Sequence, residues 1–157
     1  MIGGELLIAT AKPRLLASVR RQATPATIGR LISNSGVWDL MKARNIQSTG
    51  HNVVVYHDEP GRDLMHSPAG IPVDIGAEIL ERFGSDDQLI CTETPGGRFI
   101  SAVHVGPLER LHEAYDAILA TVRSEGLKLA GPYWEFYGHW SDDPAAFETT
   151  VSYSLRD

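Results

Sequence analysis

The sequence has one cysteine, few basic residues and no long apolar run, and each scarcity excludes a class of protein. A lone cysteine, Cys91, cannot form an internal disulfide and is typical of a reducing cytoplasm. The formal net charge of −6, with Arg20-Arg21 as the only basic doublet, argues against a surface for nucleic acid. No apolar stretch approaches the roughly 20 residues of a membrane helix, and the N-terminus lacks a signal-peptide pattern. We therefore expect a cytoplasmic protein that binds neither nucleic acid nor a membrane.

The chain length suits one domain with its own hydrophobic core. A chain of 157 residues with 43% hydrophobic residues needs no disulfide or metal to hold its core. Gly84-Ser85-Asp86-Asp87 interrupts the pattern near the midpoint. We predict one domain over residues 1–157, made of two pseudo-repeats at about 1–83 and 84–157. The sequence leaves the oligomeric state open, a monomer included.

The first half of the chain predicts a strand, a helix and two further strands. Pro13 separates two apolar stretches, which are either two strands or one interrupted strand, because proline cannot donate to a sheet ladder. Gly36 weakens the middle of the helix by about 1 kcal/mol relative to alanine, so we expect a kink or break there. The expected elements are strands at 5–10 and 14–20, a helix at about 25–44, a strand at 52–57 and an extended segment at 71–83.

The second half repeats this succession. Pro95-Gly96-Gly97 predicts the tip of a hairpin between two strands. An apolar stripe at helical spacing follows Gly106-Pro107, and Gly126 is a good helix stop. The expected fold class is α+β, and the expected elements of this half are strands at 89–92 and 98–105, a helix between Pro107 and Gly126, and strands at 133–137 and 147–155.

The most aromatic stretch of the chain precedes the last strand and contains one carboxylate, Glu135. Side chains alternate along a strand, so Glu135 shares a face with Tyr133 and Tyr137, and Trp134 and Phe136 face a core on the other side. A carboxylate between aromatic rings loses solvation unless it is hydrogen-bonded or meets a cation. Glu135 is therefore the first candidate for a functional residue.

A faint internal repeat gives this strand a partner. Residues 52–57 follow the first helix as residues 133–137 follow the second, and aligning Tyr56 with Tyr137 sets Val54 opposite Glu135. Pockets with a few polar groups prefer the interface between such modules. The alignment predicts a cleft between the two strands, with Tyr56 in its wall.

The second half also resembles a known family. A strand enters His104-Val-Gly-Pro107, an amphipathic helix follows, and Gly131-Pro132 then leads into Glu135-Phe-Tyr137. This succession resembles the GyrI-like small-molecule-binding family, the effector-binding domain of BmrR- and Rob-type regulators. The resemblance implies duplicated strand-helix-strand-strand modules, which form an antiparallel sheet with a central groove for lipophilic, often cationic compounds. It places Glu135 at the centre of that groove.

The resemblance also bears on regulation. A strand is expected almost from residue 1, so we expect no helix-turn-helix segment ahead of the domain and no transcription-factor role. An inhibitor that docks on another protein is a third function known in the family, and no residue of this sequence points to it.

Several side chains are candidates for the walls of a ligand site. Tyr56, Tyr133 and Tyr137 would offer ring faces to a cation held by Glu135. Each of these tyrosines is at least as well explained as a packing residue. The alternative for Glu135 is a salt bridge to an arginine or lysine, and the aromatic residues on its own face favour a site instead. The remaining candidates for ligand contact are Trp38, Trp140 and His104. Trp38 is equally explained as a core residue, Trp140 either caps the groove or covers a turn, and His104 is better explained as a hydrogen-bonded strand histidine.

The six histidines do not predict a metal site. His112-Glu113 lacks a second histidine at helical distance, and no cysteine pair accompanies the others. No glycine-rich phosphate loop stands between a strand and a helix. We expect no metal and no cofactor.

Two functions remain open. The first is a binding module that sequesters or senses a hydrophobic, cationic small molecule, with Glu135 as the counter-charge. The second, implied by stand-alone members of the resembling family, is a hydrolase that opens the cyclopropane ring of DNA-alkylating natural products. Glu135 would then be the general base on a water, and Tyr137 or another phenol would donate to the carbonyl that takes up charge.

Overall fold

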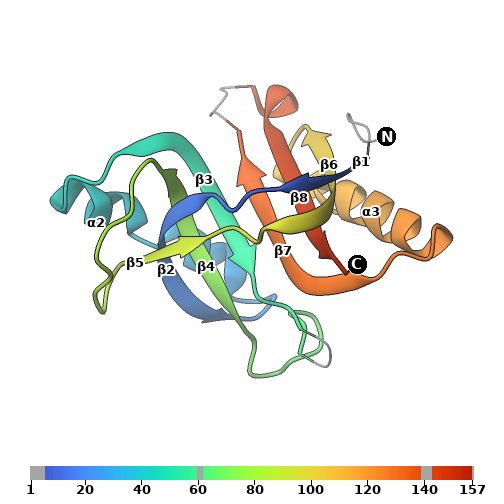
Figure 1. Cartoon of the computed structure of the whole chain (residues 1–157), viewed down its shortest axis with the longest axis horizontal. Coiled ribbons are helices and arrows are strands. Elements are labelled where there is room, and N and C mark those ends of the chain that lie inside the picture. Colours follow the sequence, from blue (N-terminus) through green and yellow to red (C-terminus); the bar gives the residue numbers. More distant parts are fainter. Residues whose placement is uncertain (1–5, 60–61, 139–142, 157) are drawn as a thin grey trace.

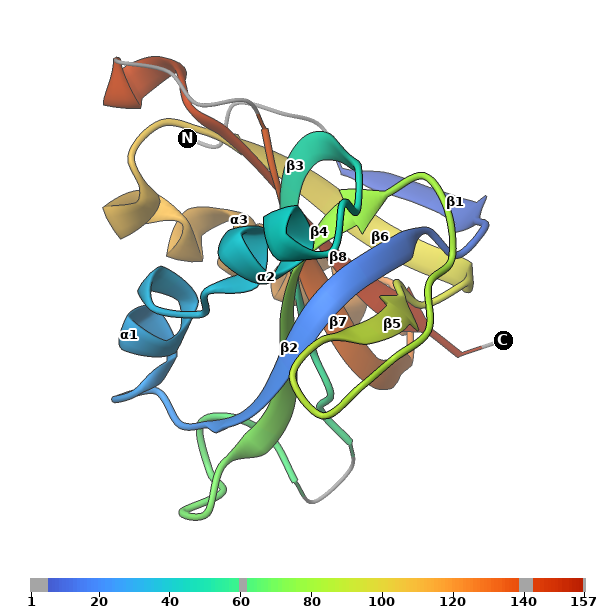
Figure 2. The ribbon, with the colours of Figure 1, turned by 90° about the vertical axis from the view of Figure 1, so that its left-hand side faces the viewer.

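The computed structural model describes residues 6–59, 62–138 and 143–156, and within them the fold is α+β. Eight strands form one antiparallel sheet in the order β1-β6-β8-β7-β3-β4-β2-β5. The three helices lie on one side of this sheet, and β1 and β5 lie toward the other (Figure 1, Figure 2). The elements in chain order are β1 (Leu7–Ala11), β2 (Leu15–Ala23), α1 (Ile28–Ser33), α2 (Val37–Ala43), β3 (Ser48–Tyr56), β4 (Ile71–Ile79), β5 (Ile90–Glu93), β6 (Gly97–Val105), the 3-10 turn η1 (Leu108–Arg110), α3 (His112–Ser124), β7 (Leu129–Tyr137), the 3-10 turn η2 (Pro144–Ala146) and β8 (Glu148–Leu155).

The expected hairpin between the strands on either side of Pro95-Gly96-Gly97 is wrong. β5 pairs with β2, and β6 pairs with β1 and β8, so the first and second halves of the chain exchange their leading strands. The connections cross closely, since a Cβ on Gly96 would lie 2.8 Å from the ring of Pro13. At the crossing the amide of Thr94 donates to the carbonyl of Arg14 at 2.9 Å. Pairing between segments far apart in the sequence outweighs the local turn signal.

The sequence around Pro13 left open whether two strands or one interrupted strand would form, and the structure has two strands. β1 and β2 are two separate strands, β1 at one end of the sheet and β2 near the other. Together with β5 and β6 they make a long antiparallel ribbon that crosses the sheet and joins its two halves (Figure 1). We call this pair of segments, residues 7–18 and 90–101, the crossing ribbon.

The predicted first helix is broken at Gly36. α1 ends at Ser33 and α2 begins at Val37, and Gly36 between them has φ 73°, a left-handed conformation that glycine adopts without strain. The helical region also starts later than predicted, because the residues after Thr24 form a turn before α1. The prediction of a break is confirmed, and that of one long helix is wrong.

Gly131-Pro132 lies inside β7, which begins at Leu129, four residues before the predicted start of this strand. The register between β7 and β8 shifts between Leu129 and Tyr133, which marks an irregularity where the glycine stands. A Cβ on Gly131 would lie 2.5 Å from the carbonyl oxygen of Asp58, so only glycine lets the two segments approach. This close approach brings the loop after β3 beside the start of the aromatic stretch.

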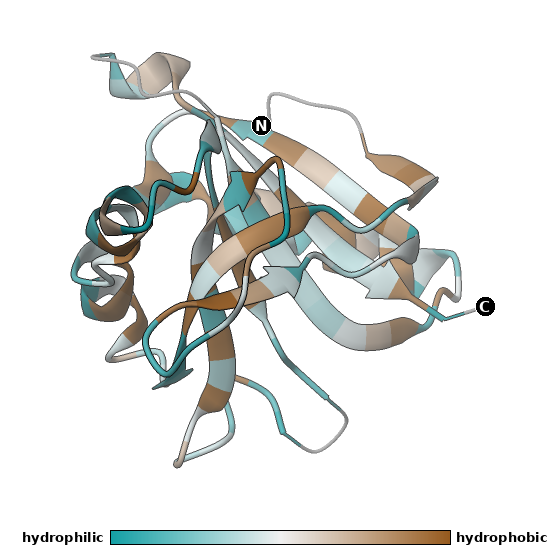
Figure 3. Cartoon of the chain, turned by 60° about the vertical axis from the view of Figure 1, so that its left-hand side comes forward, coloured by the Kyte–Doolittle hydropathy of each residue, from teal (hydrophilic) through white to brown (hydrophobic). Residues whose placement is uncertain are grey.

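The sheet separates two clusters of hydrophobic side chains. The larger lies between the sheet and the helices, and the smaller joins Leu16, Val53, Val55 and Trp134 on the face beneath the crossing ribbon. Brown hydrophobic and paler polar segments alternate along several strands (Figure 3). The predicted alternation of β7 is therefore confirmed, with Trp134 in the smaller cluster and Phe136 packed against it. None of the helices in the described part of the chain is long and apolar enough to cross a membrane.

Candidate functional site

Glu135 lies at the centre of the sheet and its carboxylate is surrounded by phenols. It pairs with Val54 of β3 in the middle of the sheet order, and only 5% of its surface is exposed. Tyr137 and Tyr56 donate hydrogen bonds to Oε1 at 2.5 Å and 3.0 Å, and the hydroxyl of Tyr115 donates to Oε2. These three donors replace part of the hydration that burial removes.

All five tyrosines of the chain gather around this carboxylate. Tyr133 stacks between Tyr56 and Tyr153, with ring centroids 4.5 Å and 4.8 Å away and interplanar angles of 9° and 17°. Tyr115, from α3, meets Tyr133 and Tyr153 edge to face at 5.9 Å. Such stacked and edge-on contacts add about 0.5–1.5 kcal/mol each beyond area burial. The strands and α3 thus build a rigid aromatic wall on the helix side of the sheet.

The tyrosines remain neutral hydrogen-bond donors at physiological pH. Burial and the negative charge of Glu135 raise the pKa of Tyr56, Tyr115 and Tyr137 well above the ordinary 10.0. No lysine, arginine or histidine in the described ranges forms an ion pair with Glu135. The salt-bridge explanation for Glu135 therefore has no partner among these residues, and its charge is met by neutral phenols alone.

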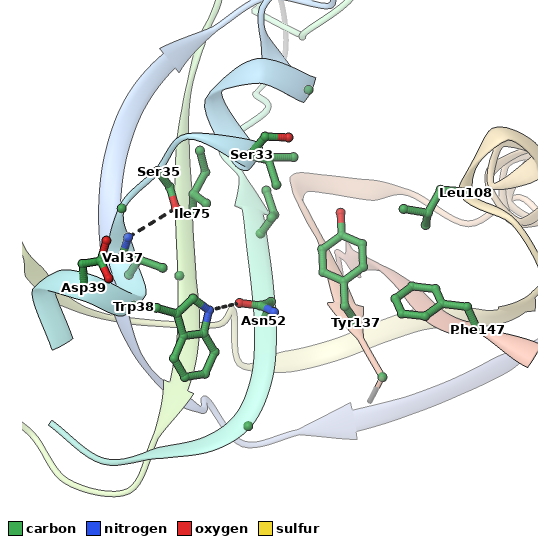
Figure 4. Close-up of a pocket in the computed structure, with 17 residues that line it drawn as sticks. Ser33, Ser35, Val37, Trp38, Asp39, Asn52, Ile75, Leu108, Tyr137 and Phe147 are labelled. Atoms are coloured by element: carbon green, nitrogen blue, oxygen red, sulfur yellow. Dashed lines mark hydrogen bonds between the residues drawn. The ribbon is translucent and has the colours of Figure 1, made fainter. Parts of the chain in front are cut away.

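A pocket of about 730 Å³ lies beside the tyrosine cluster, between α1 and α2 on one side and η1 on the other (Figure 4). Tyr137 stands in the middle of the view and is the one cluster tyrosine that lines the pocket. Trp38, 43% exposed, donates from Nε1 to Oδ1 of Asn52 at 2.6 Å and forms part of the wall. Its lining residues are Gly29, Ile32, Ser33, Ser35, Gly36, Val37, Trp38, Asp39, Gly50, Asn52, Val54, Ile75, Gly76, Leu108, Tyr137, Gly138 and Phe147.

The structure distributes the predicted site residues unevenly. Tyr56 and Tyr133 belong to the buried stack and do not line the pocket. His104 is buried on β6, where its Nε2 lies 2.9 Å from the carbonyl oxygen of Pro107, and it is not among the lining residues. Trp140 lies outside the described residues. Glu135, Tyr137 and Trp38 are the candidates that the structure brings to the pocket or directly beneath it.

Sequence reasoning missed three residues that belong to the tyrosine cluster or lie beside it. Tyr115 fits the apolar stripe of α3, and Tyr153 fits the alternation of the last strand, so neither stands out as a site residue. A tyrosine within an aliphatic stripe carries a hydroxyl that needs a partner when buried, and this was an available signal. Asp58, in the turn after β3, is half-buried, and burial raises its pKa from 3.8 to about 6. Nothing in the sequence around Asp58 separates it from an ordinary turn aspartate.

The described ranges contain no group of three or more histidine, cysteine, aspartate or glutamate side chains that could hold a metal ion. The chemistry available around Glu135 is thus that of one carboxylate, neutral phenols and aromatic ring faces. Such a set attracts positive charge and apolar surface together.

A family model for the GyrI-like small-molecule-binding domain matches residues 8–153. The chain belongs to this family. A search of curated proteins found no sequence match.

Solved structures of the same fold lie at low sequence identity, so they show the fold alone. The C-terminal domain of EcmrR has a TM-score of 0.78 at 18% identity, and 99% of each chain is covered. SAV2435 bound to tetraphenylphosphonium has a TM-score of 0.66 at 8% identity, with 97% of this chain and 94% of that one covered. A hydrolase from Listeria innocua has a TM-score of 0.59 at 9% identity, with coverage of 97% and 92%.

Proposed function

We propose that this GyrI-like domain binds a lipophilic, cationic small molecule, for sequestration or sensing in the cytoplasm, with Glu135 as the counter-charge. The observation that carries the proposal is a buried carboxylate, next to a pocket of about 730 Å³, whose hydrogen-bond donors in the described part of the chain are all neutral phenols. A pocket of this volume is within the range that holds drug-sized ligands. SAV2435, a distant fold neighbour, was solved in complex with tetraphenylphosphonium, which is a lipophilic cation.

Tyr137 connects the pocket with the carboxylate. It lines the pocket and donates to Glu135 Oε1 at 2.5 Å, so a cation against its ring has the carboxylate directly behind it. Two opposite charges about 8 Å apart interact by about 2 kcal/mol at an effective dielectric constant near 20. That energy is about a 30-fold difference in affinity. The rings of Tyr137 and Trp38 add apolar contact and attraction between the cation and the ring faces.

The test compares a cation with a neutral molecule of similar shape. Calorimetric titration with tetraphenylphosphonium and with triphenylphosphine oxide should show that Glu135→Gln weakens binding of the cation about 30-fold and leaves the oxide within a few-fold of wild type. Glu125→Gln, an exposed acid after α3, is the matched control and should change neither affinity. Equal affinity of Glu135→Gln and wild type for the cation would show that the counter-charge role is wrong.

A second candidate is the hydrolase that opens a cyclopropane ring. The short contact between Tyr137 and Glu135 puts an acid and a base together, as this chemistry needs. A water would attack the ring carbon, Glu135 would take the proton of the water, and the electrons of the broken carbon–carbon bond would pass to a carbonyl that Tyr137 protonates or hydrogen-bonds. The burial of Glu135 behind three phenols leaves little access for that water, so binding is the function that the geometry favours.

Mass spectrometry separates the two candidates. The protein is incubated with a cyclopropane-bearing alkylator, and the product gaining one water is followed over time. Turnover that disappears in Glu135→Gln and persists in Glu125→Gln would establish the hydrolase. Tight binding of the alkylator without turnover would rule it out.

A further inference from the structure

The opposite face of β7 carries a second cavity, of about 320 Å³, beneath the crossing ribbon. Trp134 and Phe136 project to this face because β7 alternates, and Phe99 of β6 completes the aromatic part of the wall. Phe99 and Trp134 lie with ring centroids 6.2 Å apart. The cavity is separated from the Glu135 pocket by the sheet itself, so the two cannot hold one ligand.

The charged residues that line this cavity are all basic. Lys12 and Arg14 stand at its rim, in the segment where the crossing ribbon passes over the sheet. Arg14 lies over the ring of Phe136, with Cζ 5.0 Å from the centroid, and its contact with Glu78 is long, at 3.4 Å. Lys12 forms no ion pair with any residue that the structure describes. The chain as a whole has a net charge of −6, whereas Lys12 and Arg14 make the surface at this cavity positively charged.

Polar groups line the cavity beside the aromatic rings. Ser101 and Ser152 pair across β6 and β8, and both are buried, yet neither hydroxyl has a side-chain partner in the described ranges. The indole N–H of Trp134, which can only donate, also lacks a partner there.

We propose that this cavity is a binding site for a small aromatic carboxylate. The rings of Trp134, Phe99 and Phe136 pack against the aromatic ring of the ligand. The hydroxyls of Ser101 and Ser152 form hydrogen bonds with polar atoms at the edge of that ring. Lys12 and Arg14 hold the carboxylate at the rim. A cavity of 320 Å³ is at the lower end of ligand pockets, so the ligand has about one ring and a short acidic substituent. This site is independent of the proposed function of Glu135, and its charge preference is the opposite.

The test uses 4-nitrobenzoate, whose nitroaromatic ring quenches tryptophan fluorescence on contact. A Trp38→Phe/Trp140→Phe background leaves Trp134 as the one tryptophan, since the chain has three. We expect saturable quenching of Trp134 by 4-nitrobenzoate and at least tenfold weaker binding of the neutral 4-nitrobenzamide. Tetraphenylphosphonium should not displace 4-nitrobenzoate, whatever its own affinity is.

Two variants test the location of the site. Lys12→Met/Arg14→Gln should weaken 4-nitrobenzoate binding at least tenfold, and the matched pair Lys42→Met/Arg123→Gln, exposed on α2 and α3, should stay within twofold. Ala11→Phe, which fills the cavity from the edge strand β1, should abolish saturable quenching without lowering the thermal midpoint. Absence of saturation into the millimolar range, equal binding of the amide, or an unchanged Lys12→Met/Arg14→Gln variant would overturn the proposal.

Discussion

Two buried carboxylates lie on opposite faces of the same sheet, and they are stabilised in different ways. Asp74 of β4 is 1% exposed and pairs with Arg20 through two hydrogen bonds, at 2.6 Å and 2.9 Å, and with His57 Nε2 at 2.8 Å. Glu135 is 5% exposed, and its hydrogen-bond partners among the described residues are tyrosine hydroxyls alone. Asp74 has the salt-bridge partners that a structural carboxylate needs, and Glu135 does not.

The two carboxylates differ in whether a positive charge stabilises their ionised form. Despite its burial, the pKa of Asp74 lies below the ordinary 3.8, because Arg20 and His57 favour its charged form. The phenols around Glu135 satisfy its hydrogen bonds and bring no opposite charge. A carboxylate that is retained without a cation, beside a pocket, is a candidate for recognition and not for stability.

The largest expected effect breaks the Asp74 ion pair. Arg20→Met leaves the buried Asp74 with His57 alone and should lower the free energy of unfolding by about 3 kcal/mol at pH 7. Arg21→Met is the matched control, because the Arg21 guanidinium donates only to the Arg20 carbonyl, and it should cost less than about 0.5 kcal/mol. Urea denaturation measures both. Equal effects of the two variants would contradict the structural role of the pair.

Neutralising each acid sharpens the comparison. Asp74→Asn removes the charge partner of the half-exposed Arg20 side chain and weakens the hydrogen bonds of a buried site, and it should cost about 2 kcal/mol. Glu135→Gln keeps an oxygen acceptor for the phenols and removes a charge that has no cation, so we expect a change within about 1 kcal/mol of wild type. Denaturation of both proteins without ligand checks this. A loss at Glu135→Gln as large as that at Asp74→Asn would remove the distinction between the two acids.

Each phenol that donates to Glu135 should contribute less to the free energy of unfolding than the ion pair between Arg20 and Asp74. Tyr115→Phe removes the one tyrosine donor to Oε2 and should lower the free energy of unfolding by about 1.5 kcal/mol. Tyr153→Phe is the control, because its ring packs in the same cluster and its hydroxyl has no hydrogen-bond partner in the described ranges. We expect a change below about 0.5 kcal/mol there. Thermal denaturation of both variants measures the two losses of stability. A larger loss in Tyr153→Phe than in Tyr115→Phe would contradict the role of the Tyr115 hydrogen bond.

The smallest effect concerns Asp58, beside the same tyrosine cluster. Its pKa in the folded protein, about 6, lies above the ordinary 3.8, so the folded state binds this proton more tightly than the unfolded chain does. Wild-type stability should therefore fall as pH rises from about 4 to 6. Asp58→Asn should be about 1 kcal/mol more stable than wild type at pH 7.5, a value reduced because Asp58 is half-exposed. The gain should vanish below pH 4 in unfolding curves collected across pH, and a gain that persists there would have another cause.

Part of the site followed from short-range rules. The period of two in a strand was enough to put Glu135 with Tyr133 and Tyr137 and to send Trp134 to the other face. The alignment of Tyr56 with Tyr137 set Val54 opposite Glu135, and these two residues do pair. It was wrong in the rest, because β3 and β7 are antiparallel hydrogen-bonded neighbours with Tyr56 opposite Tyr133, and no cleft separates them. The predictions of strand faces hold because alternation depends only on neighbouring residues.

Other parts depended on contacts that no local pattern encodes. The turn residues at Pro95-Gly96-Gly97 favoured a hairpin, and β5 and β6 instead took partners far away in the sequence. The hydroxyl of Tyr115 reaches Glu135 only because α3 packs over β6 and its neighbours in the sheet. Arg14 overlies Phe136, and Lys12 lines the same cavity, only because the crossing ribbon passes there.

By itself, the sequence determined the faces of the strands, the break at Gly36 and the choice of Glu135 as the central acid, since backbone geometry and side-chain alternation act over a few residues. The tertiary structure alone decided what surrounds that acid. It brought three phenols to Glu135 and no cation from residues 6–59, 62–138 and 143–156, and it gave Asp74 an arginine and a histidine. The physical reason is that the stability of a buried charge depends on groups close in space, and folding brings those groups from distant parts of the chain.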